Sequence, residues 1–200
     1  MRDSDTADLT CLHSLEAVLN GLGLTDPLER AKIRPLCVPR HFDKGETLLS
    51  AGQLAEHSFF LCSGLVRFYY VTEDGREYNK SFSREQQFAG AIQDSVSPQP
   101  GRFSIQALEP TDALLIPLQG LYGLYQTSLA WANLGRLYME SLAVRKTRRE
   151  AAFLLDSAER RYRLFLEQEP VLARRLPLYH IASFLGITDV ALSRIRKRIG

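Results

Sequence analysis

The spacing of apolar residues changes twice along the chain, and each change predicts a different kind of structure. Leucines recur at helical spacing over residues 8–22, and residues 26–33 suit a second short helix with proline in its first turn. From residue 38 to 117, short apolar runs alternate with turn residues, which is typical of a β-sandwich, jelly roll or barrel. The expected strands are 47–49, 58–62, 65–71, 78–82, 103–108 and 113–116, with Asp74-Gly75 as a hairpin turn and 89–102 as a loop-rich insertion.

Beyond Pro117 the apolar spacing becomes helical again and stays so. It predicts a short helix over 118–126 and a long, proline-free helix over 129–155. An apolar stripe along the long helix, with spacings of 3, 4 and 4, comprises Trp131, Leu134, Tyr138 and Leu142. A helix of this length has more surface than so small a domain can cover, so we predict that the stripe is a dimer interface. The alternative is a helix that lies wholly on its own domain.

Residues 156–200 are predicted to form a small helical domain whose end, 177–200, is a helical hairpin. Ser157 suits the N-cap of its first helix. In the hairpin, Gly186 suits the left-handed residue that ends one helix before the next begins. The helix-spaced apolar residues that would face inward are Ile181, Ala182 and Leu185 in the first helix and Leu192, Ile195 and Ile199 in the second.

The outer face of the second hairpin helix is polar and basic. A short exposed helix with arginine, lysine and serine on one face suits the second helix of a helix-turn-helix, which enters the major groove of DNA. Arginine at such a position can bond guanine through two hydrogen bonds. The candidate DNA-binding residues are Thr188, Asp189, Val190, Ser193, Arg194 and Lys197. The alternative is a packed hairpin whose basic face is only solvated.

Charge is distributed unevenly along the chain. Residues 141–200 hold 13 lysines and arginines against 6 acidic residues, whereas residues 1–140 hold 12 against 17. This favours a basic C-terminal region that binds a polyanion. No apolar run approaches the roughly 20 residues of a membrane span, and the N-terminal residues do not begin a signal peptide. We therefore expect no membrane association and a cytoplasmic protein.

The three cysteines, Cys11, Cys37 and Cys62, are scattered without a Cys-x-x-Cys pair. We expect free, buried thiols in a reducing compartment, and neither a metal nor another cofactor. The histidines have no ligand spacing. His180 lies in the first hairpin helix, where we expect it to face a phosphate or solvent.

A β-roll, a long helix and a C-terminal helix-turn-helix, in this order, resemble the Crp/Fnr family of bacterial transcription regulators over nearly the whole chain. The segments that carry the resemblance are Gly45-Glu46 with Ala51-Gly52, 59–67, 105–109 and, most specifically, 181–188 with 192–196. The resemblance implies an α+β fold. Its domains would be a cyclic-nucleotide-binding-like β-roll over 1–127, a dimerisation helix over 128–155 and a DNA-binding domain over 156–200.

The family's activity gives further expectations by resemblance. It implies a homodimer on palindromic double-stranded promoter DNA, recruitment or blocking of RNA polymerase, and a small-molecule effector in the β-roll. Arg194 matches the family's base-reading arginine, whereas Asp189 and Val190 stand where the family often has other base-contacting residues. The preferred DNA sequence should therefore differ from the best-known one.

The chain departs from cyclic-nucleotide-binding relatives at the effector pocket. The family uses a Gly-Glu-Leu segment and an Arg-Ser pair, where this chain has Gly90-Ala91-Ile92 and Gly101-Arg102. If Phe103 and Ile105 face the interior, strand alternation directs Arg102 and Ser104 outward. We therefore expect the β-roll not to bind cyclic AMP or cyclic GMP in the usual way. The closely spaced N-terminal cysteines of the iron–sulfur branch are also absent.

Two other functions compete with the regulator. The first is a sensing or scaffold module whose helical hairpin binds protein. A steep salt dependence of binding to duplex DNA would favour the regulator over this module. The second is a cupin-like metal enzyme in the β-roll. No His-x-His or paired-carboxylate pattern supports a catalytic or metal site, so we expect no enzyme activity.

Overall fold

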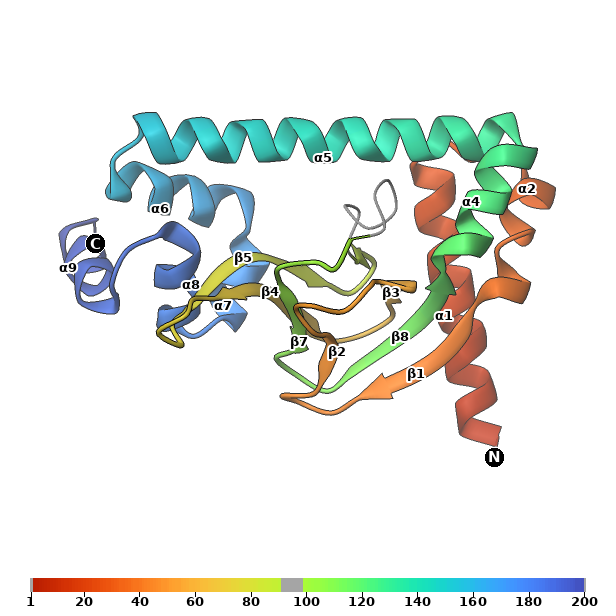
Figure 1. Ribbon diagram of the computed structural model, residues 1–200, viewed down its shortest axis with the longest axis horizontal. Helices are drawn as coiled ribbons and strands as arrows, with labels where there is room; N and C mark the ends of the chain where they lie inside the picture. Colours follow the sequence, from red (N-terminus) through yellow and green to blue (C-terminus); the bar gives the residue numbers. More distant parts are fainter. Residues whose placement is uncertain (1, 91–98, 200) are drawn as a thin grey trace. The chain divides into compact units, whose positions relative to one another are not determined.

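The computed structural model describes residues 2–90 and 99–199, with the side chains of residues 2–8 left aside (Figure 1). The chain forms two compact units. The first comprises Met1–Tyr70 and Phe82–Met139, and the second comprises Val71–Ser81 and Glu140–Gly200. The second unit therefore contains a short piece of the β-strand region besides the C-terminal helices.

Two four-stranded sheets form the β-strand region, which belongs to the first unit apart from residues 71–81. The sheet orders are β1-β8-β3-β6 and β2-β7-β4-β5. Strand β8 pairs antiparallel with β1 and β3, and β7 pairs antiparallel with β2 and β4. The strands are β1 Val38–Phe42, β2 Thr47–Leu49, β3 His57–Leu61, β4 Leu65–Val71, β5 Glu77–Arg84, β6 Phe88–Ala89, β7 Ser104–Ala107 and β8 Thr111–Pro117. The six expected strands are confirmed, whereas β1 and β6 were missing from the prediction.

Residues 59–61 of strand β3 are continuously apolar because both faces of the sheet are covered there. Phe59 and Leu61 face the core between the two sheets, whereas Phe60 belongs to a second core under the helices. The two cores thus sandwich the sheet that contains β8. A strand buried on both faces loses the apolar–polar alternation of a strand with one wet face.

Helices from both ends of the first unit build that second core. They are α1 Arg2–Gly21, the 3₁₀ turn η1 Arg34–Leu36 and α4 Leu118–Thr127, and α1 and α4 contact β8 (Figure 1). Helix α2 Pro27–Ala31 lies between α1 and η1 in the chain and has no buried residue. The side chain of Asp26 caps α2 by accepting a hydrogen bond from the Leu28 N–H at 2.8 Å. The expected helices at these positions are confirmed.

The cysteine prediction was wrong for two of the three residues. Cys11 of α1 and Cys62, just after β3, form a disulfide, and only Cys37 is a free thiol. The two partners are 51 residues apart in sequence. They meet because α1 packs on the sheet, which cysteine spacing alone does not reveal.

Apart from residues 71–81, the described part of the second unit is mainly helical. Helix α5, Leu129–Leu155, is continuous, as predicted, and its residues up to Met139 belong to the first unit. It is followed by α6 Ala158–Gln168, α7 Pro170–Arg175, α8 Leu178–Leu185 and α9 Asp189–Ile199. Ser157 caps α6 as expected, with its side chain accepting from the Arg160 N–H at 3.2 Å. Helix α7 was not predicted, although Pro170 suits the first turn of a helix.

Candidate nucleic-acid interface

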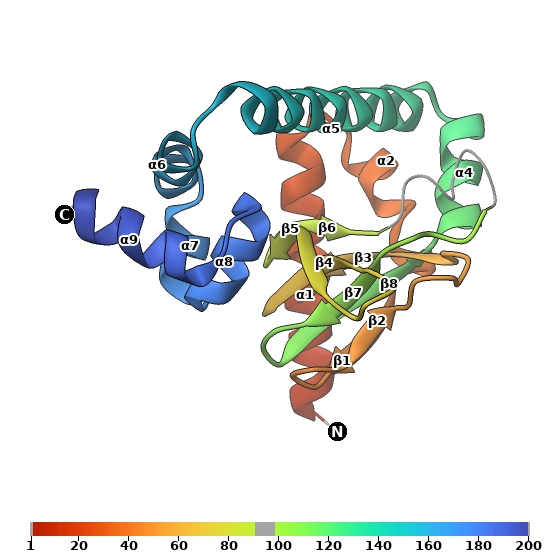
Figure 2. The same ribbon diagram turned by 60° about the vertical axis from the view of Figure 1, so that its left-hand side comes forward.

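Helices α8 and α9 form the predicted hairpin (Figure 2). Gly186 ends α8 in the left-handed conformation, with φ of 69°. Its N–H donates to Ser183 O at 3.2 Å, and the Ile187 N–H donates to Ala182 O at 3.1 Å. These bonds satisfy the carbonyls at the helix end. The Thr188 hydroxyl then caps α9 by accepting from the Ala191 N–H at 3.2 Å.

Helix α9 has one buried and one exposed face, as its sequence predicts. Leu192 and Ile195 are buried, and Ile199 is half-buried. Every candidate DNA-binding residue is exposed: Thr188, Asp189, Val190, Ser193, Arg194 and Lys197. Val190, Ser193, Arg194 and Lys197 share one face of the helix because their spacing follows the 3.6-residue period. We call the six candidate DNA-binding residues together the α9 outer face.

The basic residues of this region divide into paired and unpaired groups. Arg163 and Arg198 both pair with Glu159, and hydrogen bonding to Arg163 lowers the pKa of that carboxyl group. Within the described residues, Arg194 and Lys197 take part in no ion pair. Their charges therefore remain available for an anionic partner.

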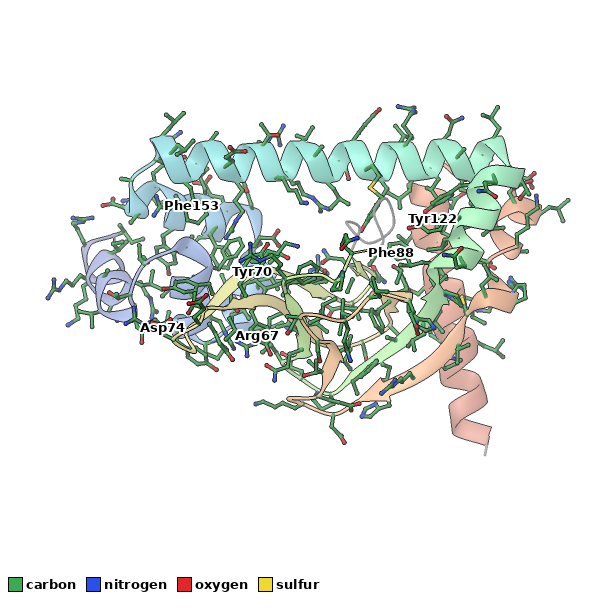
Figure 3. All side chains as sticks on the ribbon, viewed as in Figure 1. Arg67, Tyr70, Asp74, Phe88, Tyr122 and Phe153 are labelled. Atoms are coloured by element: carbon green, nitrogen blue, oxygen red, sulfur yellow. A yellow bond between two sulfur atoms is a disulfide. The ribbon has the colours of Figure 1, made fainter. Side chains whose placement is uncertain are left out.

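Two further arginines serve the structure of the second unit. Arg149 donates to Phe184 O at 2.9 Å, and Arg161 donates to Leu185 O at 3.1 Å. Both therefore place positive charge at the carbonyl end of α8, where the helix dipole favours it. Both guanidinium groups lie over the Phe153 ring, with their central carbons 4.8 and 5.0 Å from its centre. Figure 3 labels Phe153. The number of basic residues in the C-terminal region is therefore larger than the number of positive charges available to a partner.

His180 is not where the sequence placed it. Its side chain is buried rather than turned to phosphate or solvent. It contacts Asn79 of β5, whose side-chain nitrogen lies 3.0 Å from His180 Nδ1. No local sequence pattern links Asn79 to His180, because the two residues are 101 positions apart.

The four residues of the predicted dimer stripe differ in their exposure. Trp131 is 1 % exposed and Leu134 is 7 % exposed, and both lie in the core under the helices of the first unit. The Trp131 indole also donates to Glu29 O at 3.0 Å. Tyr138 is half-buried, with its ring 5.9 Å from that of Phe88, and Leu142 is half-buried. Trp131 and Leu134 are therefore covered within their own unit, whereas the dimer interface stays a prediction.

Helix α5 carries a different apolar stripe on its exposed side. Leu137, Val144 and Leu155 are exposed, and Leu155 reaches 83 %. Their spacings of 7 and 11 residues return to one helical face. We call them the α5 outer stripe.

The predicted effector residues are only partly visible. Gly90 lies against Ser58: a β-carbon added at Gly90 would stand 3.5 Å from Ser58 Cα. Ala91 and Ile92 lie outside the described residues. Arg102 is exposed while Phe103 is buried, in agreement with the alternation argument. Ser104 is buried instead of exposed, because its hydroxyl accepts a hydrogen bond from the Ala51 N–H at 3.0 Å.

The first unit has a hollow whose lining includes Pro100. It measures about 560 Å³ and is lined by Leu48, Leu49, Gly52, Gln53, Leu54, Glu56, His57, Phe59 and Pro100. No lysine or arginine is among these lining residues. A buried phosphate needs a fixed cation, which the described lining does not offer.

One exposed cluster in the first unit contains the residue types of a catalytic triad in the wrong order. Asp112 lies in the middle, accepting from Ser63 Oγ at 2.8 Å and lying 2.7 Å from His41 Nδ1. Because the serine bonds the carboxylate and not the imidazole, no base activates it. Among residues 2–90 and 99–199, no group of three His, Cys, Asp or Glu side chains could hold a metal ion. In the same described part, no helix is long and apolar enough to cross a membrane.

The β-strand region matches a known protein family. Residues 39–128 match the cyclic nucleotide-binding domain family. The sequence matches no curated protein.

Solved structures match over most of the chain. FixK2 from Bradyrhizobium japonicum superposes with a TM-score of 0.69 at 20% identity, covering 82% of this chain and 84% of that one. A protein from Eubacterium rectale, described as a transcriptional regulator of the crp/fnr family, gives 0.69 at 18% identity, covering 86% and 82%. The c-di-GMP-responsive global regulator CLP of Xanthomonas campestris gives 0.65 at 17% identity, covering 87% and 91%. The chain therefore has the fold of the Crp/Fnr transcription regulators.

Proposed function

We propose that this chain is a DNA-binding transcription regulator of the Crp/Fnr type. The observation that carries the proposal is the α9 outer face, which presents Arg194 and Lys197 without acidic partners on a helix capped for a helix-turn-helix. Exposed cations on such a helix can neutralise phosphates and read base edges. The shared fold of known regulators supports this function, and a protein-binding scaffold is the alternative.

The proposed regulator acts as a homodimer in the cytoplasm. Its interface is the α5 outer stripe, because Trp131 and Leu134 are occupied within their own unit. A two-fold dimer needs an inverted-repeat site, whose half-sites lie roughly 10 base pairs, or a multiple of that, apart. Val144→Glu should yield monomers in sedimentation experiments, whereas Val144→Leu should retain the dimer.

The β-roll takes an effector other than a cyclic nucleotide in this proposal. The described lining of the hollow has Glu56 and His57 but no fixed cation, and Arg102 is exposed. Titration calorimetry with cyclic AMP and cyclic GMP should show no saturable binding. A micromolar dissociation constant that Arg102→Ala abolishes would overturn this point. RNA polymerase is the proposed protein partner at the promoter.

The decisive experiment is selection of bound sequences from random duplex DNA, followed by substitution of Arg194. Arg194→Ala should weaken binding to the selected site by about 1–3 kcal/mol and relax base selectivity at one position of each half-site. Arg160→Ala is the matched control, because it removes the same charge from an exposed residue of α6 that pairs with Asp156. Unchanged selectivity in Arg194→Ala would refute the proposal. Weak dependence of binding on salt would instead favour the scaffold.

A further inference from the structure

The second unit includes residues 71–81, which end strand β4 and begin β5. Gly75, with φ of 79°, closes their turn, and Asp74 lies at its tip (Figure 3). Within this unit the segment contacts α8 through its backbone. The Asn79 N–H donates to Ser183 Oγ at 2.9 Å, and that hydroxyl donates to Glu77 O at 3.3 Å. One serine of the helix-turn-helix therefore bonds two backbone groups of the hairpin.

The side chain of Asn79 adds a second, buried connection. It is 4 % exposed, and its Nδ2 donates to His180 O at 3.1 Å. Because a carbonyl can only accept, this bond fixes which end of the amide is nitrogen. The same nitrogen lies 3.0 Å from His180 Nδ1, so Nδ1 must accept. The geometry therefore requires neutral His180 with its proton on Nε2.

This connection is not arranged for stability alone. Asn79 Oδ1 is buried and has no hydrogen-bond partner within the described part of the chain. Leaving a buried acceptor unpaired costs free energy, whereas an apolar residue of the same shape would avoid that cost. Because Asn79 is a buried amide with this cost at the contact between β5 and α8, we expect it to fix the orientation of α8.

The connection lies away from the proposed DNA-binding surface. It uses residues of α8, while the whole α9 outer face is exposed. The β4–β5 hairpin therefore does not cover the α9 outer face. At the other end of α8, Arg149 and Arg161 hold the terminal carbonyls. Helix α8 is thus fixed near both ends, and α9 follows it through a three-residue turn, Gly186–Thr188.

We propose that Asn79 is a positioning residue for DNA recognition. Through His180 and Ser183 it holds α8, and with it α9, in the orientation that fits a specific site. The segment 71–81 is then the element of the second unit that sets the orientation of the recognition helix. This inference rests on the function proposed above.

The test compares three single variants of the full chain on the selected DNA site. Asn79→Ala should weaken specific binding about tenfold while leaving binding to random duplex DNA unchanged, because the phosphate-contacting charges remain. His180→Ala should have a similar effect, and the double variant should be no weaker than either single one. Glu73→Ala, an exposed residue of the same hairpin, should bind as the wild type does. Wild-type specific affinity of Asn79→Ala, or strictly additive effects, would overturn the proposal.

Two measurements do not depend on DNA. Nitrogen-15 NMR of the wild-type protein should show neutral His180 protonated on Nε2, and protonation on Nδ1 would overturn the proposed contact. Hydrogen exchange of the α8 amides should be faster in Asn79→Ala, while the amides of β3 and β8 keep their protection. If the wild-type chain binds no specific DNA site, the proposed function fails, and these two measurements still decide whether Asn79 holds α8.

Discussion

The two compact units hold their helices in different ways. In the first unit, α1, α4 and the start of α5 share one apolar core with the sheet, and the Cys11–Cys62 disulfide ties α1 to the end of β3. In the second unit, α8 has apolar contacts through Ile181, Ala182 and Leu185 but is also held by directed hydrogen bonds from arginines and Asn79.

The difference suggests distinct mechanical roles. Apolar burial is large and non-directional, so a helix held by it resists displacement as a whole. A hydrogen bond contributes only about 0.5–1.5 kcal/mol net, and water can replace it, but it fixes orientation. The first unit is therefore suited to be a rigid frame, and the second to carry helices whose orientation can change.

The largest expected effect follows from cutting into the apolar core of the first unit. Phe60 is fully buried, and its ring meets that of Phe88 edge-on at 5.3 Å. Phe60→Ala should lower the free energy of unfolding by about 3–5 kcal/mol, measured by urea denaturation. The half-exposed Phe153 is the matched aromatic of the second unit, and Phe153→Ala should cost clearly less. Equal costs for the two variants would contradict the comparison.

Reducing the disulfide should have the next largest effect. The bond closes a loop between residues 51 apart, so its loss should destabilise the first unit by about 2–4 kcal/mol. Urea denaturation of Cys62→Ser, and of the wild type with and without a reductant, measures this. Cys37→Ser is the control, since burial raises the pKa of that free thiol to about 11. A denaturation midpoint unaffected by reductant would show that the bond does not stabilise the frame.

A smaller loss is expected at the turn of the helix-turn-helix. At Gly186 a side-chain carbon would stand 2.7 Å from Phe153 Cε1, and the left-handed backbone disfavours other residues. Gly186→Ala should destabilise the second unit by about 1–2 kcal/mol and speed hydrogen exchange in α8 and α9. Gly123→Ala in α4 is the control, because nothing lies near its added carbon. Unchanged exchange in α9 would mean that the turn is less tightly determined than its geometry implies.

The smallest effect should be a pH dependence in the first unit. Hydrogen bonding to Asp112 raises the pKa of His41, and the same bond lowers the pKa of Asp112. The histidine's contribution is complete below its unfolded pKa and is lost as pH rises through its folded pKa. Thermal denaturation between about pH 5 and 8 should therefore show a wild-type advantage over His41→Gln that shrinks as pH rises. An advantage that grows with pH would contradict this assignment.

The order of elements follows from the sequence alone. Period changes near Val38 and Pro117 mark the β-strand region, and Gly186 with its flanking apolar stripes marks the hairpin. These features are local, because backbone preference and the 2- and 3.6-residue periods act over neighbouring residues. The exposure of Arg194 and Lys197 could be predicted for the same reason, since the apolar face of α9 determines the opposite face.

Tertiary structure decided which partners distant residues find. It paired Cys11 with Cys62, buried Trp131 and Leu134 in their own unit, and brought Asn79 against His180. An apolar stripe on a helix says that a surface will be covered, but not whether its own sheet or another chain covers it. A buried histidine and an exposed one can occupy the same helical position in sequence. Contacts between residues far apart in the chain depend on how the sheets and helices pack, and no local period records that packing.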